Sequence, residues 1–141
     1  MINFYSEIDF HFVEKADEVR NWLTDLSGFH TFQIGELSYI FCDDAYLLRI
    51  NQEYLAHDDY TDIITFDYTK NKVLGGDIFI SIERVRDNAE QFHVAFEQEL
   101  GRVLAHGLLH LIGFMDKTND HAEEMRKQEE HALSMSSFPF R

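Results

Sequence analysis

Two histidines, a glycine and an aspartate stand close together in the sequence, at His106, His110, Gly113 and Asp116. On a helix, residues four positions apart project from one face, so both imidazoles can bind the same metal ion. Gly113 can adopt the left-handed conformation that ends a helix, and the chain can then return Asp116 to that ion. Three such ligands leave the fourth position of a tetrahedral zinc site open for catalysis. We therefore predict one Zn²⁺ per chain, bound by His106, His110 and Asp116, which act in catalysis through the metal.

The third ligand has a rival in His121, five residues beyond Asp116. Asp116 is favoured because His121 would need a longer loop and has the position of a helix-start residue. An aspartate leaves the bound ion with a smaller net charge than a third histidine would, so water at the ion is acidified less. The spacing is also similar to that of metal-dependent peptidases. Gly107, however, occupies the position of their catalytic glutamate, which disfavours peptide hydrolysis.

The composition predicts one folded, acidic domain over residues 1–141. Apolar residues make up 45% and aromatic residues 14% of the chain, enough to form a core and to exclude a disordered or low-complexity protein. Twelve basic against 26 acidic side chains give a net charge of −14. That balance argues against non-specific binding to nucleic acid or to anionic membranes as the main activity.

Cysteine content and hydropathy indicate where the protein works. Cys42 is the single cysteine, which excludes an intramolecular disulfide and a cysteine-based zinc finger and gives no reason to expect a disulfide-linked partner. The N-terminal residues lack the basic and apolar regions of a signal peptide. No apolar run approaches the roughly 18 residues that cross a bilayer. We expect a cytoplasmic protein without a membrane partner.

Hydrophobic periodicity predicts strands and helices in alternation. Gly28 is expected to end the first helix, and the Asp43–Asp44 pair to cap the second. A short polar turn predicts a hairpin between the last two strands, so the sheet is expected to be mixed. The fold class is α/β or α+β, a single compact domain with about four strands and about five helices packed around them. The predicted strands are 2–12, 37–42, 63–68 and 77–82, and the predicted helices are 13–26, 44–54, 83–92, 95–112 and 121–133.

The segment 106–116 resembles the His-Gly-x-Leu-His-Leu-x-Gly-Tyr-Asp-His signature of the YbeY family of bacterial endoribonucleases. Residues 60–66 are similar to the family's Pro-Thr-Asp-Val-Leu-Ser-Phe strand, and residues 76–81 to its Gly-Asp-Ile strand. Met125 and Glu129 fall where the final helix of the family has similar residues. The matching signature positions are His106, Gly107, Leu109, His110, Leu111, Gly113 and, conservatively, Phe114.

This resemblance implies a zinc-dependent endoribonuclease that cuts single-stranded RNA in ribosomal RNA maturation and ribosome quality control. Metal-bound water would attack, or assist attack, at phosphate, and the implied partners are ribosomal RNA and ribosomal subunits. Two departures stand out, because the family's third zinc-binding histidine falls on Asp116 and an arginine assigned to RNA binding or catalysis falls on Leu55. Arg49, Arg84 and Arg86 are equally open as its replacement. The candidate substrate-binding residues are Thr61, Asp62, Arg84 and Arg86.

Two other functions stay open at this stage. One is a non-catalytic ribosome assembly factor in which the metal is structural, and the other is a metzincin-like peptidase, disfavoured by Gly107. Asp62 or Asp77 is a candidate for orienting a histidine ring, although each is more simply a turn or cap residue. A group of glutamates near the C-terminus is interpreted as a solvated helix face. Its members are Glu123, Glu124, Glu129 and Glu130.

Overall fold

The computed structural model describes residues 1–10, 15–54 and 61–136. Within these residues, the predicted alternation of strands and helices is confirmed. The strands are β1 (Ile2–Ser6), β2 (Gln33–Cys42), β3 (Ile63–Asp67) and β4 (Val73–Ser81). The helices are α1 (Ala16–Phe29), α2 (Asp44–Tyr54), α3 (Ile82–Phe92), α4 (Phe96–Ile112) and α5 (Asn119–Ser134).

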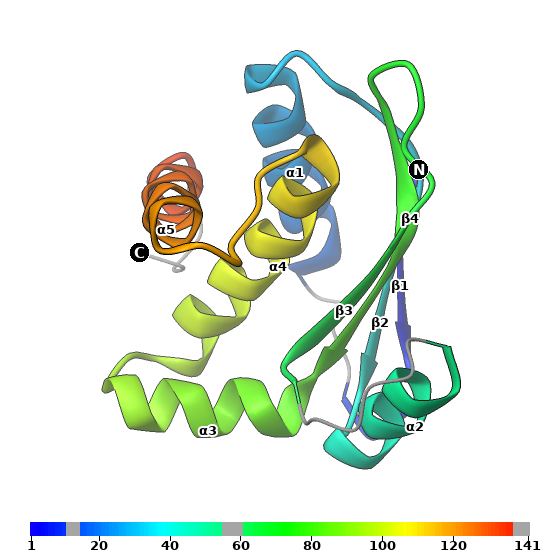
Figure 1. The fold of residues 1–141 in the computed structure, drawn as a ribbon, viewed down its shortest axis with the longest axis vertical. Helices are drawn as coiled ribbons and strands as arrows, with labels where there is room; N and C mark the ends of the chain where they lie inside the picture. Colours follow the sequence, from blue (N-terminus) through cyan, green and yellow to red (C-terminus); the bar gives the residue numbers. More distant parts are fainter. Residues whose placement is uncertain (11–14, 55–60, 137–141) are drawn as a thin grey trace.

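The strands form one mixed sheet in the order β1-β2-β4-β3 (Figure 1). β1 and β4 run parallel to β2, whereas β3 runs antiparallel to β4. The predicted hairpin is therefore the β3–β4 pair. Its turn places Asn71 and Lys72 at positive φ, 54° and 63°. Because β3 is the last strand in the order, it forms one edge of the sheet.

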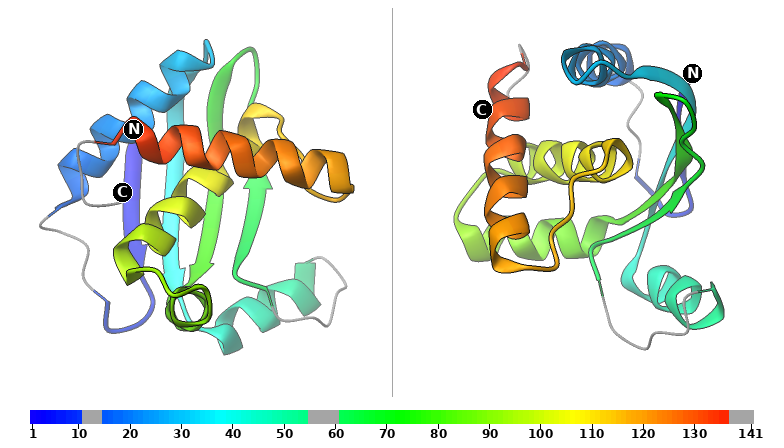
Figure 2. Two further views of the ribbon diagram at one scale, coloured as in Figure 1. Left: turned by 90° about the vertical axis from the view of Figure 1, so that its left-hand side faces the viewer. Right: turned by 45° about the horizontal axis from the view of Figure 1, so that its top comes forward.

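The helices lie in layers beside the sheet (Figures 1 and 2). α1 and α4 cover one face, and α5 packs on the far side of α4, so that α4 is sandwiched between the sheet and α5. α2 lies against the opposite face at one end of the sheet. The architecture is thus a single compact α+β domain with a four-stranded mixed sheet and five helices, as predicted.

Close packing fixes α4 against the sheet. A Cβ atom added to Gly107 would lie 2.9 Å from Ile78 Cγ2 and 3.1 Å from Ile63 Cδ1, closer than such atoms normally approach. The buried Tyr39 hydroxyl donates a hydrogen bond of 2.8 Å to the Leu104 carbonyl. The mid-helix glycine that costs helix propensity therefore allows α4 to approach β4 and β3. Residues on the neighbouring face of α4 are held in a defined position as a result.

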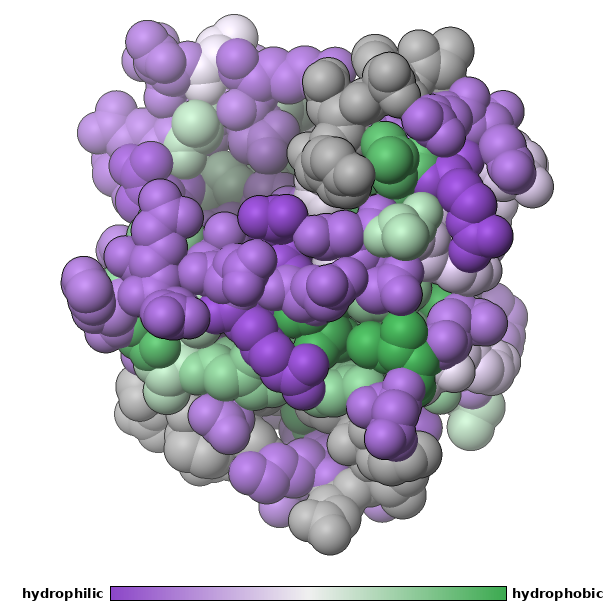
Figure 3. Space-filling model, turned by 90° about the horizontal axis from the view of Figure 1, so that it is seen from below, coloured by the Kyte–Doolittle hydropathy of each residue, from purple (hydrophilic) through white to green (hydrophobic). Residues whose placement is uncertain are grey.

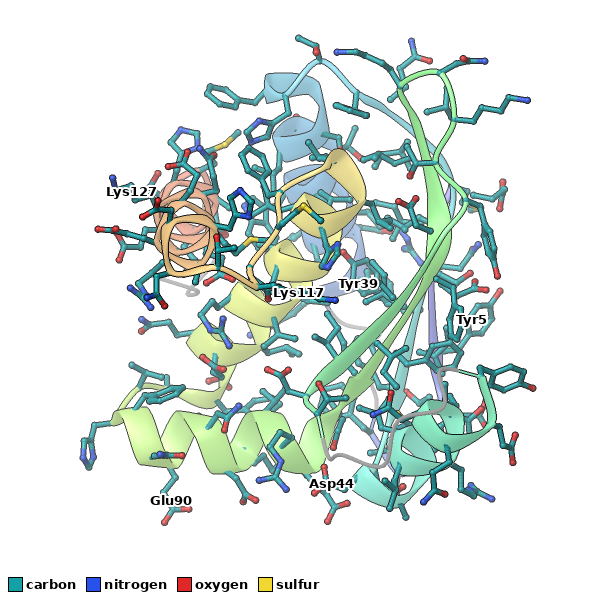
Figure 4. The ribbon with its side chains drawn as sticks, viewed as in Figure 1. Tyr5, Tyr39, Asp44, Glu90, Lys117 and Lys127 are labelled. Atoms are coloured by element: carbon teal, nitrogen blue, oxygen red, sulfur yellow. The ribbon has the colours of Figure 1, made fainter. Side chains whose placement is uncertain are left out.

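Side chains alternate between the two faces of the sheet. Figure 4 shows Tyr39 pointing toward the helices and Tyr5 pointing away from them. On the second face, α2 packs Leu47 and Ile50 against Ile64 in a small apolar cluster. Seen from below, where α2 and α3 lie, apolar side chains are exposed among hydrophilic ones (Figure 3).

Two boundaries differ from the prediction. Gly28 does not end the first helix, because α1 continues to Phe29 and the left-handed position that reverses the chain is taken by Thr31, with φ 67°. The extended N-terminal segment is a strand only to Ser6, and its predicted end at Phe12 lies outside the described residues. Among the helices that the structure describes, none has the length and apolar character to cross a membrane.

Candidate functional site

One face of α4 carries Arg102, His106 and His110 at intervals of one turn. They open into a pocket of about 390 Å³ between α4, the β3 edge of the sheet and the segment after α4. Gly113 ends α4 with φ 127°, as predicted, and the following residues return Asp116 to the pocket. This cavity is called the His106 pocket below. It is lined by Thr61, Asp62, Ile63, Thr65, Arg102, His106, His110 and Asp116.

The His106 ring is held between two carboxylates. Its Nδ1 lies 2.6 Å from Glu129 Oε2, and its Nε2 lies 3.4 Å from Asp116 Oδ2. Burial by itself lowers the pKa of His106, but the hydrogen bond and charge of Glu129, with the charges of Asp116 and Asp62, outweigh it and raise the pKa. Since Glu129 accepts the Nδ1 proton, the neutral ring presents the lone pair of Nε2 to the pocket.

Two donor atoms of the His106 pocket have the spacing that a tetrahedral zinc ion requires. Zinc binds histidine nitrogen at about 2.0–2.1 Å and carboxylate oxygen at about 2.0–2.2 Å, so two such donors in a tetrahedral site lie about 3.4 Å apart. The separation between His106 Nε2 and Asp116 Oδ2 is 3.4 Å. Histidines that bind metals also usually donate their other N–H to a carboxylate, as His106 does to Glu129. His106 and Asp116 therefore fit two positions of a zinc site.

His110 stands further from this pair. Its ring centroid is 6.3 Å from that of His106, whereas two rings bound to one tetrahedral ion have centroids roughly 5 Å apart. Within residues 1–10, 15–54 and 61–136, no three His, Cys, Asp or Glu side chains are arranged so that they could hold a metal ion. For both rings to bind one ion, their centroids would have to approach each other by about 1 Å.

Arg102 also lines the His106 pocket, although it was not among the site residues predicted from the sequence. Its guanidinium forms two hydrogen bonds with Glu99, of 2.9 and 2.7 Å, and one of 3.1 Å with Glu129. Asp62 Oδ2 lies 3.8 Å from the same guanidinium. Burial by itself lowers the pKa of Arg102, but the hydrogen bonds and charges of Glu99 and Glu129 outweigh it and raise the pKa. The position one turn before His106 was the available signal, because residues 102, 106 and 110 share a helix face.

With this geometry established, comparison with known proteins identifies the family. The family model described as Endoribonuclease YbeY matches residues 3–137. The chain belongs to the YbeY endoribonuclease family. Its signature histidines, His106 and His110, are the residues that α4 presents to the pocket. The prediction of a hydrolytic endoribonuclease is confirmed by this membership.

Relatives of the YbeY family match nearly the full chain. Endoribonuclease YbeY of Christiangramia forsetii is 51% identical over 95% of this chain and 93% of its own length. The protein of the same name from Flavobacterium johnsoniae is 50% identical over 96% of both chains. A solution structure from Thermotoga maritima is similar in fold, with a TM-score of 0.66 and 26% identity over 95% of this chain and 90% of that one.

The structure separates the predicted substrate residues into two groups. Thr61 and Asp62 line the His106 pocket beside the signature histidines of the YbeY family. Arg84 and Arg86 do not line this pocket. Arg84 instead pairs with Asp44 at 2.7 Å, between α3 and α2, and Arg86 lies over the Phe96 ring. Leu55 itself lies outside the described residues.

The positions of Glu129 and His121 in the structure bear on three further predictions. Glu129 is only 5% exposed and contacts His106 and Arg102, so its assignment to a solvated face was wrong. It also takes the orienting role considered for Asp62 or Asp77. His121 is exposed in the first turn of α5 and does not line the pocket, which leaves Asp116 as the better placed third ligand.

Proposed function

We propose that the protein is a zinc-dependent endoribonuclease that cuts single-stranded RNA in ribosomal RNA maturation and ribosome quality control, in the cytoplasm. His106, His110 and Asp116 would hold one zinc ion per chain, and ribosomal RNA and ribosomal subunits would be its partners. The observation that carries the proposal is the separation of 3.4 Å between His106 Nε2 and Asp116 Oδ2, with Glu129 fixing the other ring nitrogen. The names of the relatives support RNA as the substrate class.

When bound, the zinc ion supplies Lewis-acid polarisation of the scissile phosphate and acidifies water. The protein supplies orientation and charge. Glu129 keeps the Nδ1 proton of His106 in place, and Glu99 anchors Arg102 through two hydrogen bonds. The Arg102 guanidinium lines the same pocket, so it would stand beside the bound zinc ion as a second positive group for a phosphate oxygen. Asp62 Oδ2 lies 3.8 Å from that guanidinium and adds a further carboxylate beside it.

Peptide hydrolysis finds no support in this geometry. The catalytic glutamate of metallopeptidases would replace Gly107, and that position packs directly against Ile78 and Ile63 of the sheet. A carboxylate there would clash with the sheet, because even a Cβ atom would lie 2.9 Å from Ile78 Cγ2.

Zinc analysis and RNA cleavage by the full chain test the proposal. Protein purified without chelator is expected to contain one zinc and to cut structured ribosomal RNA, and His110→Ala is expected to lose both properties. His121→Ala, outside the pocket, is the matched control and is expected to retain them. Zinc with ribosomal subunits bound but RNA uncut would instead identify an assembly factor with a structural metal. Loss of zinc in His121→Ala alone would overturn the ligand set.

Asp116 offers a second test of the same site. Replacing it by histidine returns the ligand set to three neutral groups, so the ion keeps its full double charge and acidifies water more strongly. We expect the pH–rate profile of Asp116→His to move to lower pH relative to the wild type. An unchanged profile, or a shift to higher pH, would contradict Asp116 as a ligand.

A further inference from the structure

The sheet face opposite α4 has a second cavity, of about 560 Å³, between α2 and the strands β3 and β4. It lies outside the His106 pocket and shares no residue with it. Five of its nine lining side chains are aromatic. This cavity is called the aromatic groove below. It is lined by Tyr46, Arg49, Ile50, Glu53, Tyr54, Phe66, Tyr68, Asp77 and Phe79.

The rings of the groove form a connected series. Tyr46 stacks on Phe79 with centroids 6.1 Å apart, and Phe79 meets Phe66 edge to face at 5.9 Å. Tyr54 extends the series, since its ring lies 6.1 Å from that of Phe66. Tyr54 and Tyr68 are 68% and 66% exposed, although rings of this size gain most from burial. Exposed faces of rigid rings beside a cavity suit a flat, unsaturated ligand.

The charges of the groove select among flat ligands. The Arg49 guanidinium lies 5.5 Å from the centre of the Tyr46 ring, and Glu53 and Asp77 add two carboxylates. One cation against two anions does not favour a ligand recognised mainly through phosphates. Nucleobases fit better, because they stack on aromatic rings and guanidinium planes and carry amino groups that donate to carboxylates.

The groove and the His106 pocket meet at the same edge strand. Successive residues of β3 point to opposite faces of the sheet. Thr65 accordingly lines the His106 pocket, whereas its neighbour Phe66 lines the groove. Because β3 is the last strand of the sheet, a single strand of RNA that passes over this edge can contact both cavities.

We propose that the aromatic groove binds unstacked bases of single-stranded RNA that flank the bond cut in the His106 pocket. The identification of this RNA as the substrate rests on the proposed function, whereas its binding in the groove does not require cleavage. The groove makes the enzyme act on single-stranded segments, because bases paired in a duplex cannot reach the rings of Tyr54 and Tyr68.

Fluorescence anisotropy with a labelled oligoadenylate of about 12 nucleotides tests the inference, with the full chain in EDTA so that no cleavage occurs. The test variant is Tyr54→Ala combined with Tyr68→Ala, which removes two exposed rings. The control is Tyr5→Ala, which is 53% exposed on the same sheet face but lies two strands away from Phe79 and outside the groove. Circular dichroism verifies that each variant is folded.

Loss of one stacking ring corresponds to about 5- to 150-fold weaker binding, so the double variant is expected to bind at least about 5-fold more weakly than the wild type. Tyr5→Ala is expected to stay within about twofold of the wild type. With Arg49 as the cation of the groove, binding is expected to fall only about threefold between 50 and 200 mM salt. The inference is overturned if the double variant binds as tightly as the wild type, or if Tyr5→Ala weakens binding equally.

RNA cleavage by the wild type, measured in parallel with zinc present, separates this inference from the proposed function. RNA that binds through the groove but is never cut would support the inference and contradict the proposed nuclease. RNA that is cut while the double variant still binds normally would support the nuclease and overturn the inference.

Discussion

Replacing Glu129 by glutamine tests how His106 is held in place. The Glu129 carboxylate accepts the Nδ1 proton of His106 at 2.6 Å and pairs with the Arg102 guanidinium at 3.1 Å. Glutamine keeps the shape and one acceptor oxygen but removes the charge that makes the imidazole a stronger donor to a metal. Loss of such a partner typically weakens metal binding or activity by about 10- to 100-fold. We expect the zinc affinity of Glu129→Gln to fall by that factor.

We expect Glu129→Gln to lower the free energy of unfolding by less than the loss of one partner from a buried ion pair usually does. Removing one partner of a buried pair costs about 3–5 kcal/mol when the other charge is left alone. Here Arg102 retains both hydrogen bonds to Glu99, of 2.9 and 2.7 Å. The loss is therefore closer to that of one hydrogen bond to a charged group, about 1.5–3 kcal/mol of the free energy of unfolding.

Competition with a zinc chelator measures the affinity, and urea unfolding in EDTA measures the stability. Glu123→Gln is the matched control, because Glu123 is exposed on the same helix, and it should change neither quantity. Equal zinc affinities for the wild type and Glu129→Gln would refute the argument that this carboxylate prepares His106 for a metal.

Two further outcomes follow from the packing and the charges. Gly107→Ala is expected to lower the free energy of unfolding in urea by about 1–3 kcal/mol, because its Cβ would lie 2.9 Å from Ile78 Cγ2. Gly28→Ala, whose Cβ would have nothing within 4 Å, should instead raise the free energy of unfolding by up to about 1 kcal/mol. Equal effects of the two substitutions would contradict the packing argument. In EDTA, the raised pKa of His106 gives stability that is complete below about pH 6.5 and is lost as the pH rises through the folded-state pKa. Thermal midpoints measured between about pH 6 and 8 should therefore fall further for the wild type than for Glu129→Gln, and parallel curves would contradict this.

Local patterns were sufficient to predict most elements of the fold. The polar turn between β3 and β4 predicted a hairpin, and the Asp43–Asp44 pair predicted the start of α2, where Asp43 Oδ1 accepts from the Tyr46 amide at 2.8 Å. The strand order was not predicted, because pairing of β2 with β4 depends on which faces meet in the core. The end of α1 was misplaced because Thr31, rather than Gly28, adopts the left-handed conformation.

The same difference between local and long-range contacts separates the site residues that were predicted from one that was missed. His106 and Asp116 were predictable because one helix and its C-terminal turn place them, and both effects are local in sequence. Glu129 was missed because it reaches His106 from another helix, 23 residues away. Its spacing from Met125 and Ala132, which are both buried, places it on the inward face of α5 and was the available signal.

The division of the site between two helices has a consequence for protein synthesis. Glu129 lies on α5, and the histidine that it orients lies on α4, so α4 leaves the ribosome first. Until α5 has been translated and has packed, His106 lacks the carboxylate that selects its tautomer. If His106 binds the proposed zinc ion, we expect the nascent chain to complete that site only once α5 has packed against α4.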